Sequence, residues 1–271
     1  MCKLNFVRKI CKNRLKIAGI DEREADYILS YELNMPITEI PLSNEDVSKR
    51  KYKRVIKKIN ERCCHKPITK IFGKAYFCGL EFIVSKHVLS PRFDTEVLVE
   101  QSLRFVKKNN RVLDLCTGSG CVAISIEKNT EAYVEGCDIS AKALKVAKRN
   151  AKKHKCNIDF YKSNMFEKVQ GKFNVIVSNP PYIETETLKG LDLEVVNYDP
   201  IIALDGGQDG LKFYKYIAKN IKKYLLEDGV LVLEIGYNQA DAVANLFKGI
   251  AKDIEIVKDY NNNDRVVVVK F

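Results

Sequence analysis

The feature that most constrains the fold is an alternation of short apolar runs and longer amphipathic segments that begins near Arg111. Apolar runs of this length indicate strands, and the segments between them have the spacing of helices. Strands that alternate with helices pair in parallel, because each helix returns the chain to the same edge of the sheet. We therefore expect an α/β domain with a mostly parallel sheet. The expected strands are 112–115, 132–137, 158–162, 173–178 and 230–235, and the expected helices are 122–128, 141–153 and 210–226.

The two ends of the chain differ from this central pattern. Near the C-terminus, apolar runs at 254–257 and 265–270 are separated by the turn-rich 261–264, which predicts a hairpin and an antiparallel last strand. The first 75 residues have helical spacing, with one helix after Asp21 and another from Ser43. Short apolar runs on both sides of Gly79 indicate a strand pair. The predicted organisation is a small helical domain at 1–75, a β-hairpin connector at 76–100 and an α/β domain at 101–271.

The net charge of +11 is concentrated near the N-terminus. Residues 1–75 contain 18 Lys and Arg against 9 Asp and Glu, whereas residues 76–271 contain 28 against 26. Such asymmetry fits a segment that binds an acidic partner, either a nucleic acid or an acidic protein surface. A solvated, lysine-rich helix face is the alternative, and charge alone does not separate the two.

Several classes of protein are excluded by composition. No apolar run approaches the roughly 20 residues of a membrane-spanning helix, and residues 1–16 lack the apolar segment and cleavage site of a secretory signal. We therefore expect a cytoplasmic protein without a membrane partner. The nine cysteines lack the paired spacing of zinc sites, so we expect reduced thiols and no metal, including at the cluster Cys63-Cys64-His65.

A strand that runs into a glycine-containing turn predicts a nucleotide site. The apolar run 112–115 is followed by Cys116-Thr117-Gly118-Ser119-Gly120 and then by the expected helix. Glycines let a ligand approach the backbone closely, and a helix N-terminus offers unpaired N–H groups. Ala123 replaces the third glycine of the dinucleotide-binding pattern, which disfavours a dinucleotide enzyme. Asp138, about 20 residues further on, is placed to bind the ribose hydroxyls of an adenosine cofactor, or else caps the next helix.

The tetrapeptide Asn179-Pro180-Pro181-Tyr182 follows the expected strand 173–178, at the end of the strand where α/β sheets bind ligands. Two prolines remove two N–H donors and leave carbonyl groups free to accept hydrogen bonds. The side-chain oxygen of Asn179 and the Pro180 carbonyl can accept both hydrogens of an amide or amino NH2 group, while Tyr182 packs on its plane. The nitrogen lone pair is delocalised, so catalysis has to orient it. A rigid surface turn is the alternative.

Four segments together resemble a known family, the peptide chain release factor N5-glutamine methyltransferases (PrmC or HemK), over essentially the whole chain. The resemblance is carried by Ser90-Pro91-Arg92-Phe93-Asp94-Thr95-Glu96, by Asp114 to Gly120, by Asn179 to Ile183, and by Asp199-Pro200 with Ala203 to Leu211. It implies a class I, Rossmann-like S-adenosylmethionine-dependent methyltransferase domain behind a helical docking domain. The implied reaction methylates the side-chain amide nitrogen of the glutamine in the Gly-Gly-Gln loop of class 1 release factors, and the implied product is S-adenosylhomocysteine.

The resemblance also assigns roles to residues. It implies cofactor contacts from Cys116, Thr117, Gly118, Ser119, Gly120, Asp138, Met165 and Asn179, with Met165 against the adenine. It implies that Asn179, Pro180, Pro181 and Tyr182 hold the substrate, and that Asn179, Pro180 and Tyr182 are catalytic. Where the family has glycine this chain has Cys116, and Asn164 replaces a common acidic residue. The chain's own Gly206-Gly207-Gln208 is taken as a coincidence.

Two further functions compete with this interpretation. A DNA or RNA adenine-N6 methyltransferase would use the same tetrapeptide on an exocyclic amine, and a basic N-terminal part would suit phosphates. No additional target-recognition region is visible after the motif, so we do not expect nucleic acid as the substrate. A basic RNA-binding module without enzymatic activity is disfavoured by the intact tetrapeptide. We expect a monomer.

Overall fold

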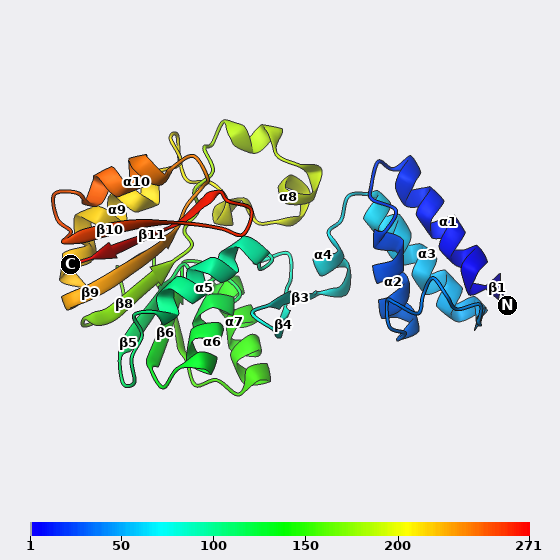
Figure 1. Ribbon diagram of the computed structural model, residues 1–271, viewed down its shortest axis with the longest axis horizontal. Helices are drawn as coiled ribbons and strands as arrows, with labels where there is room; N and C mark the ends of the chain where they lie inside the picture. Colours follow the sequence, from blue (N-terminus) through cyan, green and yellow to red (C-terminus); the bar gives the residue numbers. More distant parts are fainter. Residues whose placement is uncertain (1) are drawn as a thin grey trace. The chain divides into compact units, whose positions relative to one another are not determined.

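The computed structural model describes residues 2–271, which form two compact units (Figure 1). The helical unit contains the described residues up to Phe72 together with Leu193–Tyr198. The sheet unit contains Gly73–Asp192 and Asp199–Phe271. Within residues 2–271, no helix is long and apolar enough to cross a membrane.

The sheet unit is built on seven strands in the order β10-β11-β9-β8-β5-β6-β7. The strands from β9 to β7 in this order are parallel, whereas β11 is antiparallel to both β9 and β10. This arrangement confirms the expected class I methyltransferase fold with its antiparallel last strand. The strands are β5 Arg111–Leu115, β6 Tyr133–Asp138, β7 Asp159–Lys162, β8 Phe173–Ser178, β9 Leu225–Glu234, β10 Asp253–Lys258 and β11 Asp264–Lys270.

Helices cover both faces of this sheet, so the strands are apolar on both sides. On one face, Val112 and Val175 pack in a core with α5, α6 and α7. Their neighbours Leu113 and Ile176 point the other way, into a core with α9 and α10. The layered arrangement is visible in Figure 1. These helices are α5 Glu96–Leu103, α6 Cys121–Asn129, α7 Ala141–His154, α9 Lys212–Asn220 and α10 Ala240–Phe247.

The predicted helix 210–226 is longer than the helix that the structure contains. Helix α9 ends at Asn220, the 3-10 turn η4 Ile221–Lys223 follows, and β9 already begins at Leu225. The reason is tertiary pairing, because Leu225 is buried and pairs with Phe173 of β8. An irregularity in the β8 to β9 register then places Gly229 inside the strand, where it does not end a helix.

The strand pair predicted around Gly79 is present as β3 Lys74–Phe77 and β4 Leu80–Ile83, which are antiparallel. Cys78 and Gly79 both have positive φ, which allows the tight connection between them. The hairpin belongs to the sheet unit, and the division between the units falls after Phe72.

The helical unit packs three long helices around a separate apolar core. Ser48 caps α3 by accepting a hydrogen bond from the Lys51 backbone N–H. The helix was expected from Ser43, but Asp46–Val47 forms strand β2 against β1, so the helix begins later. Helix α1 was not predicted. The elements are β1 Cys2–Lys3, α1 Leu4–Ile17, α2 Glu24–Leu33, β2 Asp46–Val47, α3 Lys49–Cys63 and α4 Ile68–Phe72.

One short helix, α8 Leu193–Tyr198, belongs to the helical unit although both flanking segments belong to the sheet unit. Its Glu194 accepts a hydrogen bond from the guanidinium of Arg62, at 2.5 Å. Arg62 is buried and also pairs with Glu24 of α2. The Tyr198 hydroxyl donates to the Cys64 carbonyl at 3.0 Å. The helical unit therefore includes a piece of chain that is distant in sequence.

Replacing Ile176 in the centre of β8 should test how far stability depends on this sheet. Ile176 is fully buried. Ile176→Ala should reduce the free energy of unfolding by about 2–5 kcal/mol, because it leaves a cavity, and Ile176→Val by about 0.5–1.5 kcal/mol. Urea denaturation followed by circular dichroism measures both. A loss below about 1 kcal/mol for the alanine variant would contradict the described packing.

Candidate active site

The candidate site lies where the order of the strands reverses direction. From β5 the chain proceeds to β6 and β7 on one side, and β8 then returns to the other side of β5. The carboxyl ends of β5 and β8 therefore flank a crevice, the usual ligand site of such sheets. The Ser178 hydroxyl at the end of β8 donates to the Leu115 carbonyl at the end of β5, at 2.6 Å. The glycine loop and the Asn-Pro-Pro-Tyr segment thus start side by side.

The loop after β5 is organised by a buried carboxylate. Asp114 Oδ2 accepts hydrogen bonds from the Thr117 hydroxyl at 2.6 Å and from the Ala123 backbone N–H at 3.1 Å. Burial raises the pKa of Asp114 to about 7, although both hydrogen bonds act in the opposite direction. Gly118 and Gly120 have positive φ, which lets the loop turn sharply into α6. The loop is therefore held from inside the protein, and its outer side faces the crevice.

Cys116 adopts a backbone conformation that favours glycine, with φ of +68°. That conformation explains why the related family has glycine at this position. The thiol of Cys116 lies 3.8 Å from the sulfur of Met165, which also has positive φ. Burial raises the pKa of the Cys116 thiol well above its usual value, so it is a neutral, apolar wall of the site.

Asp138 ends β6 and faces the same crevice. Its Oδ2 accepts a hydrogen bond from the Gly118 backbone N–H at 2.9 Å, and its Oδ1 accepts from the Ser140 N–H at 2.8 Å. The cap of α7 is Ser140, whose hydroxyl oxygen accepts from the Ala143 N–H. Burial raises the pKa of Asp138. Asp138 thus links the glycine loop to the end of β6. The alternative role considered for Asp138, capping the next helix, is filled by Ser140 instead.

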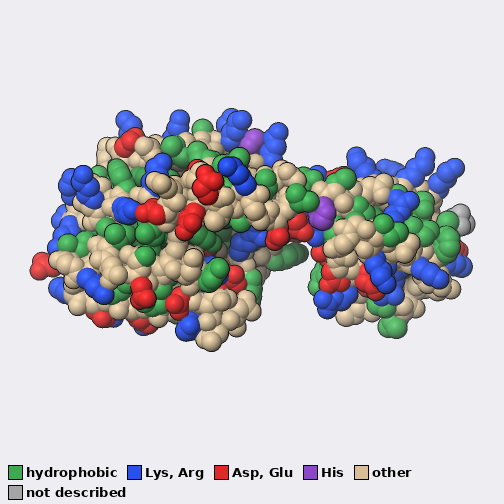
Figure 2. Space-filling view, turned by 90° about the horizontal axis from the view of Figure 1, so that it is seen from above, with side chains coloured by type: hydrophobic (Ala, Val, Ile, Leu, Met, Phe, Trp, Pro, Cys, Tyr) green, Lys and Arg blue, Asp and Glu red, His purple; other side chains and the backbone are tan. Residues whose placement is uncertain are grey.

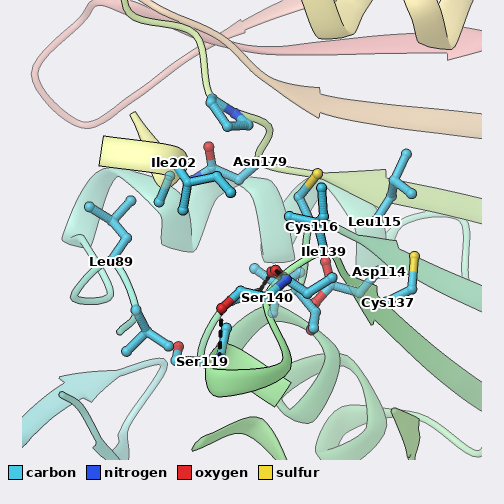
Figure 3. Close-up of a pocket in the computed structure, with 18 of the residues that line it drawn as sticks. Leu89, Asp114, Leu115, Cys116, Ser119, Cys137, Ile139, Ser140, Asn179 and Ile202 are labelled. Atoms are coloured by element: carbon cyan, nitrogen blue, oxygen red, sulfur yellow. Dashed lines mark hydrogen bonds between the residues drawn. The ribbon is translucent and has the colours of Figure 1, made fainter. Parts of the chain in front are cut away.

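These elements enclose a cavity of about 540 Å³, shown in Figure 3. Its wall includes Cys116, Thr117, Gly118, Ser119, Asp138, Met165, Asn179 and Pro181. Three other predicted site residues do not line it: Gly120 is the N-terminal cap of α6, and Pro180 and Tyr182 lie outside the wall. The sequence assigned no role to several wall residues, namely His87, Leu89, Pro91, Ile139, Ile202 and Tyr216. The sequence pointed to two of these residues only indirectly. Pro91 lies within a segment that carries the family resemblance, and Ile202 lies between two parts of another such segment.

The Asn-Pro-Pro-Tyr segment is held in place by a neighbouring loop. Gln239 donates a side-chain hydrogen bond to the Tyr182 carbonyl at 2.9 Å, and the Gly206 N–H donates to the Ile183 carbonyl at 2.8 Å. A Cβ atom at Gly206 would come within 2.7 Å of Tyr182 Cα, so close packing requires glycine there. The Gly206-Gly207-Gln208 sequence therefore has a local structural reason. Burial raises the pKa of the Tyr182 phenol well above its usual value.

The described part of the chain contains no candidate metal site. Within residues 2–271, no group of three or more His, Cys, Asp and Glu side chains could hold a metal ion. All nine cysteines are free thiols.

Comparison with known proteins first defines a class. Residues 90–196 match the family model described as the methyltransferase small domain. The crystal structure of a methyltransferase from Pyrococcus furiosus has the same fold, with a TM-score of 0.56 and 16% identity, covering 82% of this chain and 98% of that one. The fold and the crevice thus define a class I S-adenosylmethionine-dependent methyltransferase.

Sequence relatives then define the family. A protein of Thermodesulfovibrio yellowstonii named release factor glutamine methyltransferase is 40% identical over 257 residues, which is 92% of each chain. A protein of the same name from Agrobacterium fabrum is 38% identical, covering 96% of this chain and 94% of its own. The chain therefore belongs to the release factor glutamine methyltransferase family.

The position of Asp138 predicts a loss of cofactor affinity in the Asp138→Ala variant. If its carboxylate binds ribose hydroxyls, removing it should weaken binding of S-adenosylmethionine or S-adenosylhomocysteine by roughly 1–3 kcal/mol. Isothermal titration calorimetry measures this change, and nicotinamide dinucleotides should bind to neither protein. Unchanged affinity would remove the ribose assignment.

Proposed function

We propose that this protein transfers the methyl group of S-adenosylmethionine to the side-chain nitrogen (N5) of the glutamine in the Gly-Gly-Gln motif of peptide chain release factors. The observation that carries the proposal is the position of Asn179, at the carboxyl end of β8 and in the wall of the cavity next to the glycine loop. The names of full-length relatives supply the substrate. Because release factors act on ribosomes, we place the protein in the cytoplasm.

The cavity fits an adenosyl cofactor by its size and by its polar groups. A volume of about 540 Å³ is within the range of small-molecule sites, and the carboxylate of Asp138 suits a pair of ribose hydroxyls. Residues 116–119 would surround the amino-acid part, and Met165 would pack against the adenine. When bound, S-adenosylmethionine supplies an activated methyl group, and its transfer to nitrogen leaves S-adenosylhomocysteine and releases one proton.

The protein's own contribution to the reaction is alignment. The lone pair of an amide nitrogen is delocalised, so the nitrogen has to be held in a fixed direction for attack. We propose that Asn179 Oδ1 and the Pro180 carbonyl accept the two hydrogens of the substrate amide. Pro181 shapes the wall, and Tyr182 supports the segment from the core side, where it is half-buried. No side chain is required as a strong base, because the proton is lost from a nitrogen that becomes acidic during transfer.

The helical unit is proposed to dock the release factor. Figure 2 shows Lys and Arg side chains over its surface. On α3, Lys49, Arg50, Lys53 and Lys57 are exposed, and no ion pair is recorded for them within residues 2–271. Arg54 differs, because it pairs with Glu32 at 3.0 Å. The first turn of α3 contains no acidic residue, so Lys49 and Arg50 in that turn oppose the helix dipole and are unfavourable for stability unless a partner neutralises them.

The proposed function is tested by methylation assays with purified protein. Radiolabelled methyl transfer should occur to a release factor and not to DNA or RNA, and tryptic mass spectrometry should place one added methyl group on the Gly-Gly-Gln glutamine. Transfer to nucleic acid without transfer to release factor would favour the adenine-N6 alternative.

Asn179→Ala should reduce turnover far more than cofactor affinity. Misplacing a reacting atom by about 1 Å can cost on the order of 100-fold, so we expect a decrease in rate of at least that size. Single-turnover methylation of the release factor at saturating cofactor measures the rate, and calorimetry measures the affinity. Equal rates for the parent and the alanine variant would rule out the alignment mechanism.

Reversing four charges on α3 should weaken capture of the release factor. A variant with glutamate at positions 49, 50, 53 and 57 should raise KM for the release factor on the order of tenfold at low salt, with unchanged cofactor affinity. The difference should shrink as ionic strength rises toward 1 M, where the screening length is about 3 Å.

A matched control reverses four exposed lysines of the sheet unit that also have no ion pair recorded within residues 2–271: Lys128, Lys222, Lys223 and Lys248. If both variants change KM equally, the effect is one of net charge. If neither does, the α3 cluster is a solvated helix face.

A further inference from the structure

Glu234, the last residue of β9, has a carboxylate buried beside the proposed substrate-binding segment. In the parallel pairing of β8 with β9, Ser178 lies opposite Leu233. The residues that follow these two in the chain, Asn179 and Glu234, are therefore neighbours across the two strands. Glu234 is 3% exposed, and its Oε2 has no hydrogen-bond partner within residues 2–271. It does not line the cavity. A buried carboxylate is costly, and its position next to Asn179 indicates a role for it.

Thr95 connects this carboxylate to Asn179. The Asn179 side-chain nitrogen donates a hydrogen bond to the Thr95 hydroxyl oxygen at 3.4 Å. Burial raises the pKa of Glu234 to about 7, although hydrogen bonding from Thr95 and from Asn179 acts in the opposite direction. Thr95 is itself buried. The three side chains thus form one connected polar cluster.

The donor and acceptor roles of these groups fix the direction of each hydrogen bond in the cluster. An ionised carboxylate only accepts, so it draws the single hydroxyl proton of Thr95 toward Glu234. The Thr95 oxygen is then left to accept a hydrogen bond from the Asn179 nitrogen. An asparagine amide whose nitrogen is held in this way leaves its oxygen for the cavity, and an oxygen is what an NH2 group of a substrate requires.

We propose that Glu234, together with Thr95, fixes the orientation of the Asn179 amide so that its oxygen faces the substrate nitrogen. Glu234, which does not line the cavity, is then a positioning residue, and Thr95, which does line it, links Glu234 to Asn179. The inference rests on the proposed function for the identity of that nitrogen, but the orientation of Asn179 can be measured without substrate or cofactor.

A pH dependence follows from the same geometry. A protonated Glu234 becomes a donor, so Thr95 is no longer forced to point its proton inward and the Asn179 amide loses its fixed direction. The charged and titratable groups that face Glu234 are Arg265 on β11, Asp94 before α5, Tyr182 and Tyr214. The pKa values of Arg265, Tyr182 and Tyr214 are raised, so these three keep their protons near neutral pH. Turnover should therefore fall as the pH decreases through about 7.

The first test is nuclear magnetic resonance on the chain without ligands. With asparagine labelled by nitrogen-15, the side-chain NH2 signal of Asn179 is assigned by its loss in Asn179→Ala. In the parent this signal should shift with a midpoint near pH 7, and in Glu234→Gln the shift should be absent. A suitable control is Glu135→Gln, which removes a half-buried strand carboxylate that pairs with Arg111 in the same sheet. It should behave as the parent.

The second test separates turnover from binding. Glu234→Gln and Thr95→Val should each lower kcat roughly 10- to 100-fold. Glu234 does not line the cavity, so Glu234→Gln should leave KM for the release factor and cofactor affinity within about twofold of the parent. Thr95→Ser keeps the hydroxyl and should restore most of the rate. The double variant should be no slower than the slower single variant, because both changes break one chain of hydrogen bonds.

Each outcome bears on the proposal. If folded Glu234→Gln and Thr95→Val proteins match Glu135→Gln in kcat, pH profile and the Asn179 signal, the carboxylate does not orient Asn179 and the proposal is wrong. If Glu234→Gln does not fold, Thr95→Val and Thr95→Ser still decide it. A parent that methylates no release factor would overturn the proposed function, whereas the resonance test would still decide the orientation of Asn179.

Discussion

Parallel pairing of β8 with β5 is the constraint on which the site depends. It aligns Leu115 with Ser178, so that the two segments that leave these residues begin at the same edge of the sheet. Each segment continues in a direction that the local backbone imposes, a glycine turn after β5 and two prolines after β8. A shift of two residues in this register would move Asn179 by more than 6 Å along the strand and separate it from the glycine loop.

Buried carboxylates organise this edge on three of the strands, β5, β6 and β9. Asp114 holds the loop after β5 from below, Asp138 ties that loop to β6, and Glu234 lies beside Asn179 at the end of β9. In each case burial raises the pKa and hydrogen bonds lower it. Such groups reduce stability compared with apolar residues, so their concentration at one edge marks the place where the fold gives up stability for a defined polar geometry.

Much of the sheet unit could be predicted from the sequence, because strands such as β5, β8 and β11 are buried on both faces and have continuous apolar runs. The parallel order, the final antiparallel strand and the position of Asn179 were all predicted on this basis. Element ends were predicted less well. Pairing with Phe173 extends β9 back to Leu225, and this depends on a contact between residues 52 positions apart, which local periodicity cannot reveal. Helix α1 was missed because its lysines and arginines obscure an apolar stripe that includes Leu4, Val7, Cys11 and Leu15.

The site was also predictable only in part. Asp138, which was expected from its order in the chain, and Met165, which was expected from the family resemblance, both line the cavity. Leu89 and Tyr216 also line it, but they come from segments that no short pattern connects to β5. Glu234 was not identified either, because a single glutamate at the end of an apolar strand has no local signature. Its significance depends on the neighbouring strand.

The pairing of Arg62 with Glu194 has a consequence for how the chain is made. Synthesis on the ribosome proceeds from the N-terminus, so the first three long helices emerge long before α8. Until Glu194 is available, Arg62 has only Glu24 as an acidic partner for a guanidinium that becomes 4% exposed in the finished protein. Most of the helical unit is translated before the sheet unit, yet it can be completed only after about 130 further residues have been added. A nascent chain stalled before residue 193 would carry this unit with its buried cation incompletely neutralised.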